Sequence, residues 1–230
     1  ETGEAEIDYE KCVSCGACVT QCPFGATVDK SYITNLIDMI KGSEGNTKYK
    51  VNAIIAPAFV SQFDYATIGQ VIQGLRELGF EGIYEAAQGA DLVAYYEAKE
   101  LEEKGFLTTS CCPAFVEYIE KNFPDLVPNI SHNLSPMGTI GKIIKDEDPT
   151  CKNIFIGPCT AKKAEFQLEK VKDYIDCVIT FEELQALFDS KDIDIENLES
   201  TPIDDATPFG RGFAKSGGVA AAVVEALIEQ

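Results

Sequence analysis

Short apolar runs alternate with longer amphipathic stretches between Val51 and Ser190, and this alternation constrains the fold more than any other sequence feature. The runs have the length of buried strands, and the stretches have the length of surface helices. Such alternation predicts an α/β domain with a mainly parallel sheet and flanking helices on both faces. The expected strands are Val51–Ala56, Gly82–Tyr84, Gly105–Thr108, Asn153–Ile156 and Tyr174–Ile179. The expected helices are Ile68–Leu78, Ala90–Lys104, Pro113–Asn122, Ser135–Lys145, Ala161–Val171 and Phe181–Ser190.

Four cysteines near the N-terminus have the spacing of an iron–sulfur ligand run. They are Cys12, Cys15, Cys18 and Cys22, and they stand in the pattern C-x-x-C-x-x-C-x-x-x-C-P. This is the bacterial ferredoxin pattern, whose thiolates hold 4Fe-4S clusters. We therefore expect residues 1–45 to form a small ferredoxin-like 4Fe-4S unit and linker, with the connection over Asp38–Tyr49. Residues 46–230 are then expected to form the α/β domain.

The acidic composition narrows the range of partners. The net charge is −19 at pH 7, from 38 acidic and 19 basic residues. Nucleic acid and anionic membrane surfaces both require a field of lysine and arginine, so we expect neither as a partner. The sequence has no apolar run of about 18 residues, and its first residues have no signal-peptide pattern. These features favour a soluble, cytoplasmic protein.

Three further cysteines lie where an expected strand ends and an expected helix begins. Cys111 and Cys112 stand in a T-T-S-C-C-P motif, and Cys159 stands in a G-P-C-T-A-K-K motif. Functional residues gather at this edge of a parallel sheet. A helix N-terminus stabilises a thiolate through its free amides and dipole, which suits metal ligation or proton exchange. Small buried residues are the alternative, and we expect that role for Cys151 and Cys177.

The order and separation of these two motifs resemble the first two active-site motifs of FeFe hydrogenases. The resemblance continues in Gly89–Leu92, Ser135-Pro136, Asp176–Thr180 and Phe213–Val219, so it covers essentially the whole chain. It implies the fold of the iron-hydrogenase active-site domain. In that family the active centre, the H-cluster, joins a 4Fe-4S cubane through a cysteine sulfur to a di-iron subcluster. The two irons carry carbonyl and cyanide ligands and a dithiolate bridge that bears an amine.

The resemblance also implies roles for individual residues. Cys112 and Cys159 match two of the cubane ligands, and Cys111 matches the thiol that exchanges protons with the bridging amine. Lys162 matches the lysine that hydrogen-bonds a cyanide ligand, a role that suits an ammonium with three donors. A backbone segment that lines the di-iron site is matched by Ala56, Pro57 and Ala58.

A proton route toward the surface is implied as well, and its members are matched by Glu97, Ser131 and Glu100. The two glutamates are three residues apart, a spacing that brings side chains together on one face of a helix. In a chain this acidic, an exposed charged face on the same helix is the alternative.

Several positions depart from the family pattern. Gly157 stands where the best-known members have a methionine and Phe115 where a tryptophan is usual, which places the chain in a divergent subgroup. The third motif, a C-x-x-x-C run that supplies the last two cubane cysteines, has no counterpart. His132, the only histidine, is expected in a loop, with a minor role beside Ser131 left open. With no initiator methionine and no partner run for Cys22, the chain is expected to be a piece of a longer protein.

Three functions stay open on this fold. The favoured one is a ferredoxin-linked hydrogenase that reversibly reduces protons to hydrogen, with electrons relayed by 4Fe-4S clusters. A hydrogen sensor would keep the H-cluster but turn over slowly, and a non-catalytic relative would bind clusters for iron–sulfur assembly. Cys111, Lys162 and Glu97 argue against the last function, because a cluster carrier does not need a proton route. The implied partners are ferredoxin, or another low-potential electron carrier, and hydrogenase maturation proteins.

Overall fold

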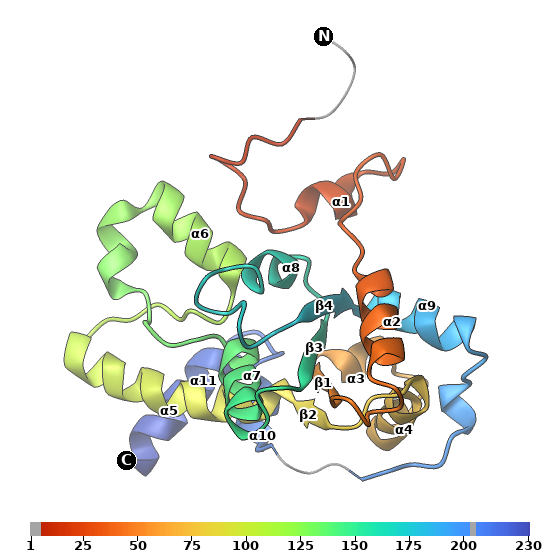
Figure 1. Cartoon of the computed structure of the whole chain (residues 1–230). Helices are drawn as coiled ribbons and strands as arrows, with labels where there is room; N and C mark the ends of the chain where they lie inside the picture. Colours follow the sequence, from red (N-terminus) through yellow and green to blue (C-terminus); the bar gives the residue numbers. More distant parts are fainter. Residues whose placement is uncertain (1–5, 203–205) are drawn as a thin grey trace.

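A parallel four-stranded sheet forms the centre of the molecule (Figure 1). The structure is a computed structural model and describes residues 6–202 and 206–230. The strands are β1 (Val51–Ile55), β2 (Ile83–Glu85), β3 (Lys152–Gly157) and β4 (Cys177–Thr180), arranged in the order β2-β1-β3-β4. All pairings are parallel, and Ile154 of β3 pairs with Ala53 on one side and Cys177 on the other. The predicted α/β fold is confirmed.

Helices cover both faces of this sheet. Helices α4 and α9 pack together on one face, whereas α7 lies on the other, with α5, α10 and α11 stacked beyond it (Figure 1). The α-helices are α1 (Ala17–Gln21), α2 (Ile33–Gly42), α3 (Phe59–Gln62), α4 (Ile68–Leu78), α5 (Ala86–Lys104), α6 (Pro113–Asn122), α7 (Pro136–Glu147), α8 (Ala161–Glu165), α9 (Phe181–Ser190), α10 (Pro208–Gly212) and α11 (Gly218–Glu229). The 3-10 helices are η1 (Pro124–Asn129) and η2 (Ile195–Asn197).

Local signals explain why several helices begin where the sequence predicts. Thr67 starts α4 with a capping box completed by Gln70, and Thr180 starts α9 in the same way with Glu183. Ser135 caps α7, and its hydroxyl accepts from the amide of Gly138. Helices α4, α6 and α9 have the predicted bounds.

Helices α5 and α7 approach each other closely at Gly89. A Cβ atom at this position would lie 2.3 Å from the carbonyl oxygen of Pro136, at the first turn of α7. Only glycine allows two backbones to come this near without moving one of them. The contact fixes the start of α7 against α5, which carries Glu97 and Glu100.

Two of the expected elements are wrong. Gly105–Thr108 is a loop, because Gly105 ends α5 with a left-handed conformation (φ 73°) and Thr108 makes only an isolated bridge to Ile130. The expected helix Ala161–Val171 stops at Glu165, since the amides of Gln167 and Leu168 donate to the carbonyl oxygens three residues back and form turns.

Other parts of the chain are more regular than expected. Helix α2 begins before the expected connection over 38–49, extends into it as far as Gly42, and buries Leu36 completely. Helices α10 and α11 lie in a region for which no helix was predicted. Cys151 and Cys177 are fully buried, as expected for core residues. The division of the chain at residue 45 stays a prediction. Among the described helices, none is both long and apolar enough to cross a membrane.

Candidate active site

A cavity of about 220 Å³ opens at the carboxyl edge of the sheet, beyond the ends of β1 and β3. Its walls combine segments that lie far apart in the sequence, from Ala56 to Ala214. Apolar side chains make up most of the lining. The sequence-predicted residues on its wall are Ala56, Pro57, Ala58, Cys111, Cys112, Cys159 and Lys162. The other lining residues are Ala86, Ala90, Pro113, Pro136, Met137, Phe155, Pro158, Phe213 and Ala214.

The three cysteines reach the cavity from the starts of two helices. Cys112 is the N-cap of α6 and is exposed, whereas Cys159 lies two residues before α8 and is half-buried. The Cys111 thiol lies 3.5 Å from the Thr109 hydroxyl. Burial raises the pKa of Cys111, although Thr109 and the Lys162 ammonium act in the opposite direction. Cys111 therefore carries its proton at neutral pH.

Lys162 places a positive charge at the cavity wall. Its Nζ donates to the backbone oxygen of Cys111 over 3.0 Å and forms an ion pair with the buried carboxylate of Glu165. Two anchors therefore hold this ammonium in place, and its remaining donor capacity is available to an anionic ligand in the cavity.

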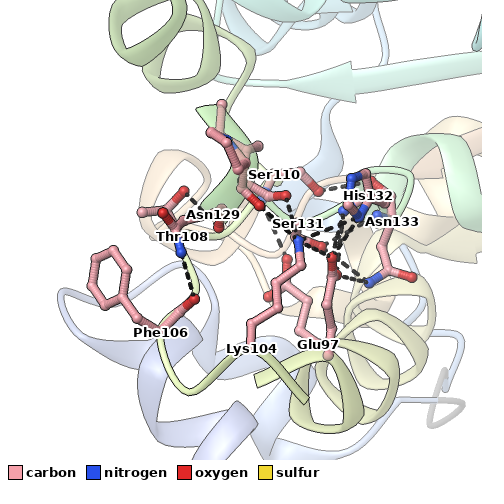
Figure 2. A network of polar contacts seen from close by, with 12 residues as sticks. Glu97, Lys104, Phe106, Thr108, Ser110, Asn129, Ser131, His132 and Asn133 are labelled. Carbon is pink, nitrogen blue, oxygen red and sulfur yellow. Dashed lines mark hydrogen bonds and ion pairs between the residues drawn. The ribbon is translucent and has the colours of Figure 1, made fainter. Parts of the chain in front are cut away.

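Behind Cys111, α5 places a carboxyl group that has no contact with solvent. Glu97 is 0% exposed, and its Oε1 accepts from the amide of Ser110 over 3.2 Å (Figure 2). Its Oε2 is buried and has no hydrogen-bond partner among the described residues. Burial raises the pKa of Glu97 against the smaller effects of hydrogen bonds from Ser110 and Ser131. The alternative of an exposed acidic face is therefore wrong for Glu97.

Glu100 occupies the next position on this face of α5, nearer the surface. Its side chain is 12% exposed, and Lys104 Nζ lies 2.8 Å from its Oε1. The backbone amide of His132 and the side-chain amide of Asn133 also donate to it. Burial alone would raise the pKa of Glu100, but the hydrogen bonds from Lys104, His132 and Ser131 outweigh it and lower the pKa.

The loop over residues 129–133 packs against both glutamates. Ser131 is 5% exposed, and its backbone amide donates to the carbonyl oxygen of Thr108 over 2.8 Å. This bond pins residues 129–133 against the segment that leads to Cys111, as Figure 2 shows. The segment 105–108, which was expected to be a strand, thus holds the loop that brings Ser131 beside Glu97 and Glu100.

Sequence reasoning missed several residues of the site. Lys104 stands four residues after Glu100, a spacing that indicates an ion pair on a helix and could have been used. Met137 reaches the cavity through tertiary packing alone, and no local pattern marks it. Phe213 begins a segment that carries the family resemblance, but the sequence assigned it no role at the site. Ser110 directly precedes the predicted residue Cys111, and its hydroxyl donates to the carbonyl of Asn133 over 2.7 Å.

The N-terminal cysteine run has an irregular backbone suited to wrapping a cluster. Ser14, Gly16 and Gly25 have positive φ angles. The amide of Ala26 donates to Cys22 Sγ over 3.3 Å, and amides including those of Ala26 and Phe24 lower the pKa of this thiol. Within the described ranges, however, no three Cys, His, Asp or Glu side chains are gathered closely enough to hold a metal ion.

Two lysines attach the ends of this run to the helices that begin at the cavity. Lys121 of α6 donates to the backbone oxygens of Tyr9 and Cys12. Lys163 of α8 forms ion pairs with Asp29 at 2.5 Å and with Glu183 at 2.8 Å. The cysteine run is thereby fastened next to the segments that carry Cys112 and Cys159, as its position above α6 and α8 in Figure 1 shows.

The expected ligand role of the cysteine run leads to a first prediction. Anaerobic addition of iron and sulfide to the chain should produce the visible absorbance of a 4Fe-4S cluster, and Cys15→Ser should weaken that absorbance, because the cluster loses a thiolate. Cys177→Ser, a substitution at a buried thiol in β4, is the control. Equal absorbance in the Cys15 variant and the unmodified chain would show that the run does not bind the cluster.

Comparison with protein families gives two matches that together cover most of the chain. The family described as "Iron only hydrogenase large subunit, C-terminal domain" matches residues 49–230. The family described as "4Fe-4S binding domain" matches residues 5–27. The second match confirms the expected iron–sulfur cofactor class.

Curated relatives include both hydrogenases and assembly factors. Iron hydrogenase 1 of Clostridium pasteurianum is 32% identical over 90% of this chain and 40% of its own length. The NADP-reducing hydrogenase subunit HndD of Solidesulfovibrio fructosivorans is 29% identical over 94% of this chain and 42% of its own length. The cytosolic Fe-S cluster assembly factor NAR1 of Kluyveromyces lactis is 27% identical over 86% of this chain and 45% of its own length. The chain thus spans less than half the length of these relatives.

Solved structures show the same fold. The FeFe-hydrogenase HydA(deltaEFG) matches with a TM-score of 0.70 at 26% identity, over 87% of this chain and 57% of that chain. A variant of the FeFe-hydrogenase HydA1 from Chlamydomonas reinhardtii gives a TM-score of 0.71 at 25% identity, over 87% and 58% of the two chains. The chain belongs to the iron-only hydrogenase large-subunit family, in which residues 49–230 correspond to the C-terminal domain.

Proposed function

We propose that the protein containing this chain is an FeFe hydrogenase that interconverts protons and hydrogen. The supporting observation is the arrangement behind the cavity. Cys111 lies on the cavity wall, and the fully buried Glu97 accepts a hydrogen bond from the amide of the preceding residue. A buried carboxyl with an unpartnered oxygen destabilises a fold, so its presence favours a functional role.

The residues on the cavity wall fit part of an H-cluster. Cys112 and Cys159 would hold two corners of the cubane, and Lys162 would donate to an anionic ligand of the di-iron part. Ala56, Pro57 and Ala58 would pack against that part. When bound, the H-cluster supplies the redox chemistry and the open metal position at which hydrogen is formed or split.

Proton transfer is the task of the chain's own side chains. Burial raises the pKa of both Cys111 and Glu97, which shifts each group toward its protonated form. A proton that leaves the Cys111 thiol for the cavity can be replaced from Glu97. Glu97 would then be reloaded by a proton that is taken up by the ionised Glu100 carboxylate nearer the surface and passed on through the Ser131 hydroxyl.

Electrons would enter through the N-terminal cysteine run. Cys12, Cys15, Cys18 and Cys22 are its proposed ligands, and the lysine contacts from α6 and α8 keep it beside the cavity. A ferredoxin or another low-potential carrier would reduce this unit, and maturation proteins would install the di-iron part. A cytoplasmic location agrees with these partners.

Iron–sulfur assembly is the second candidate function, because NAR1 proteins are among the relatives. A protein of that function would use the cysteine ligands but would have no need of Glu97 or Lys162. Infrared spectra of the full-length, maturated protein separate the two functions. Carbonyl and cyanide bands are expected for a hydrogenase, and their absence after maturation would favour the assembly function.

The 230-residue chain on its own should evolve no hydrogen from a reduced low-potential donor. Apart from Cys111, whose proposed role is proton exchange, only Cys112 and Cys159 of the described residues offer thiols at the cavity, so the cubane lacks two of its cysteine ligands. Gas chromatography of the headspace gives the measurement, with the full-length protein as positive control. Hydrogen production above that of a metal-free sample would contradict this prediction.

A further inference from the structure

We propose that His132 is the surface end of the proton route that leads through Glu100, Ser131 and Glu97 to Cys111. The proposal rests on the proposed function, because it assigns the group that exchanges protons between bulk water and that route. It makes the only histidine of the chain a proton-exchanging residue rather than a passive loop residue.

The position of the ring carries the proposal. His132 Nδ1 lies 2.7 Å from Glu100 Oε1, and the imidazole side chain is 79% exposed. One ring nitrogen therefore contacts the route, while most of the ring lies in water. Figure 2 shows the His132 ring at the edge of the network, with Glu97 rising from α5 below it. The backbone amide of His132 also donates to Glu100, which holds the residue in this orientation.

The charge state of Glu100 explains why a further group is needed. Its lowered pKa means that it carries no proton at neutral pH, and its side chain is 12% exposed. A proton must therefore reach it from a neighbour that binds and releases protons in this range. The imidazole is the side chain suited to such an exchange, and His132 is the residue that places one in contact with Glu100.

The transfer balances without any other reactant. Water delivers a proton to Nε2 of the neutral ring, and the proton on Nδ1 moves to Oε1 of Glu100. The ring is then neutral again with its proton on Nε2, and exchange with water restores the Nδ1–H form. In the direction of hydrogen oxidation, each transfer runs in reverse.

Two charged groups of α5 face His132, and they favour opposite arrangements of its ring proton. Glu100 accepts from Nδ1–H, whereas Lys104 Nζ lies 3.4 Å from Nδ1 and could only donate to an unprotonated nitrogen. The neighbouring loop residues Ser131 and Asn133 are uncharged. The proposal requires the contact with Glu100 to decide the tautomer.

Nitrogen NMR of the chain tests this requirement without any metal. Because the chain has one histidine, ¹⁵N-histidine labelling gives a single ring whose two shifts report the protonated nitrogen. We expect Nδ1–H in the neutral ring and a change to Nε2–H in Glu100→Gln. A ring that is already in the Nε2–H form in the unmodified chain would overturn the proposal.

The second test of the proposal measures hydrogen turnover of the maturated full-length protein. His132→Gln preserves a donor toward Glu100 but cannot relay a proton, so it separates structure from transfer. We expect turnover to fall about 10-fold, less than the roughly 10²–10⁴-fold typical of an acid–base group at the reacting atoms, because water still reaches Glu100 slowly. Added imidazole should restore it, and KM for the electron carrier should stay unchanged.

The controls separate failure of this proposal from failure of the proposed function. Lys142→Gln, at an exposed lysine of α7, should keep full turnover without imidazole. Full turnover of His132→Gln at every buffer concentration would overturn the role of His132 alone. A maturated, unmodified protein that neither evolves nor oxidises hydrogen would instead overturn the proposed function.

Discussion

Replacing Cys111 by alanine in the full-length protein is expected to abolish most turnover and to leave the cofactor in place. Its thiol lies on the cavity wall and retains its proton at neutral pH, since burial raises its pKa. Loss of a proton-transferring group at the reacting atoms typically costs about 10²–10⁴-fold in rate. Cys111→Asp should recover part of that rate, because a carboxyl group also binds and releases protons.

Cys112→Ala is the matched variant, since it removes a thiol from the adjacent residue. This substitution should reduce the cofactor content itself, because the cubane loses a thiolate bond. Infrared bands of the bound carbonyl and cyanide groups, set against turnover in each variant, distinguish the two outcomes. The assignment of the pair is wrong if the bands disappear in Cys111→Ala or if that variant retains full activity.

Lys163→Met is expected to lower the free energy of unfolding by about 3 kcal/mol, the lower end of the usual cost of removing one partner from a buried ion pair. The Lys163 side chain is 6% exposed, and it neutralises Asp29 and Glu183 at once. It also donates to the backbone oxygen of Lys30 over 3.0 Å. Without it, the half-buried Glu183 carboxylate that caps α9 loses its cationic partner.

The same variant should release the N-terminal cysteine run from the domain. Hydrogen exchange of the amides in residues 6–31 is expected to become faster, while the amides of β1 and β3 stay protected. Lys172→Met is the control, because its ion pair with Glu169 is exposed and contributes little. Equal unfolding curves for the two variants would contradict the proposed anchoring role of Lys163.

The parts of the fold that the sequence predicts are those with local causes. Helices α4 and α9 begin at Thr67 and Thr180, where a capping box marks the first turn. Strands β1 and β3 are buried runs that local hydrophobicity identifies. The loop at Gly105 could not be predicted in this way, because an apolar run becomes a strand only when a partner strand pairs along its length. Thr108 finds such a partner at a single position.

For the candidate site as well, features with a local cause could be predicted and features set by tertiary packing could not. The motif around Cys159 follows strand β3, so its place at the carboxyl edge of the sheet follows from a parallel sheet. Cys111 follows a loop instead of the expected strand, and it reaches the same cavity through tertiary packing. The complete burial of Glu97 and the contact between His132 and Glu100 depend on how the 129–133 loop folds over α5. Side-chain burial and loop packing are tertiary properties, and neither has a periodic signal in the sequence.

The residues that line the cavity lie far apart in the sequence, and this separation sets an order of events during biosynthesis. The first wall residue is Ala56 and the last is Ala214, so the wall is incomplete until the ribosome has released both. A nascent chain that ends before Phe213 can expose Cys111, Cys112 and Cys159 but cannot enclose anything between them. A metal group that needs this enclosure can therefore be loaded only after synthesis has passed Ala214 and the segments on either side of the cavity have folded together.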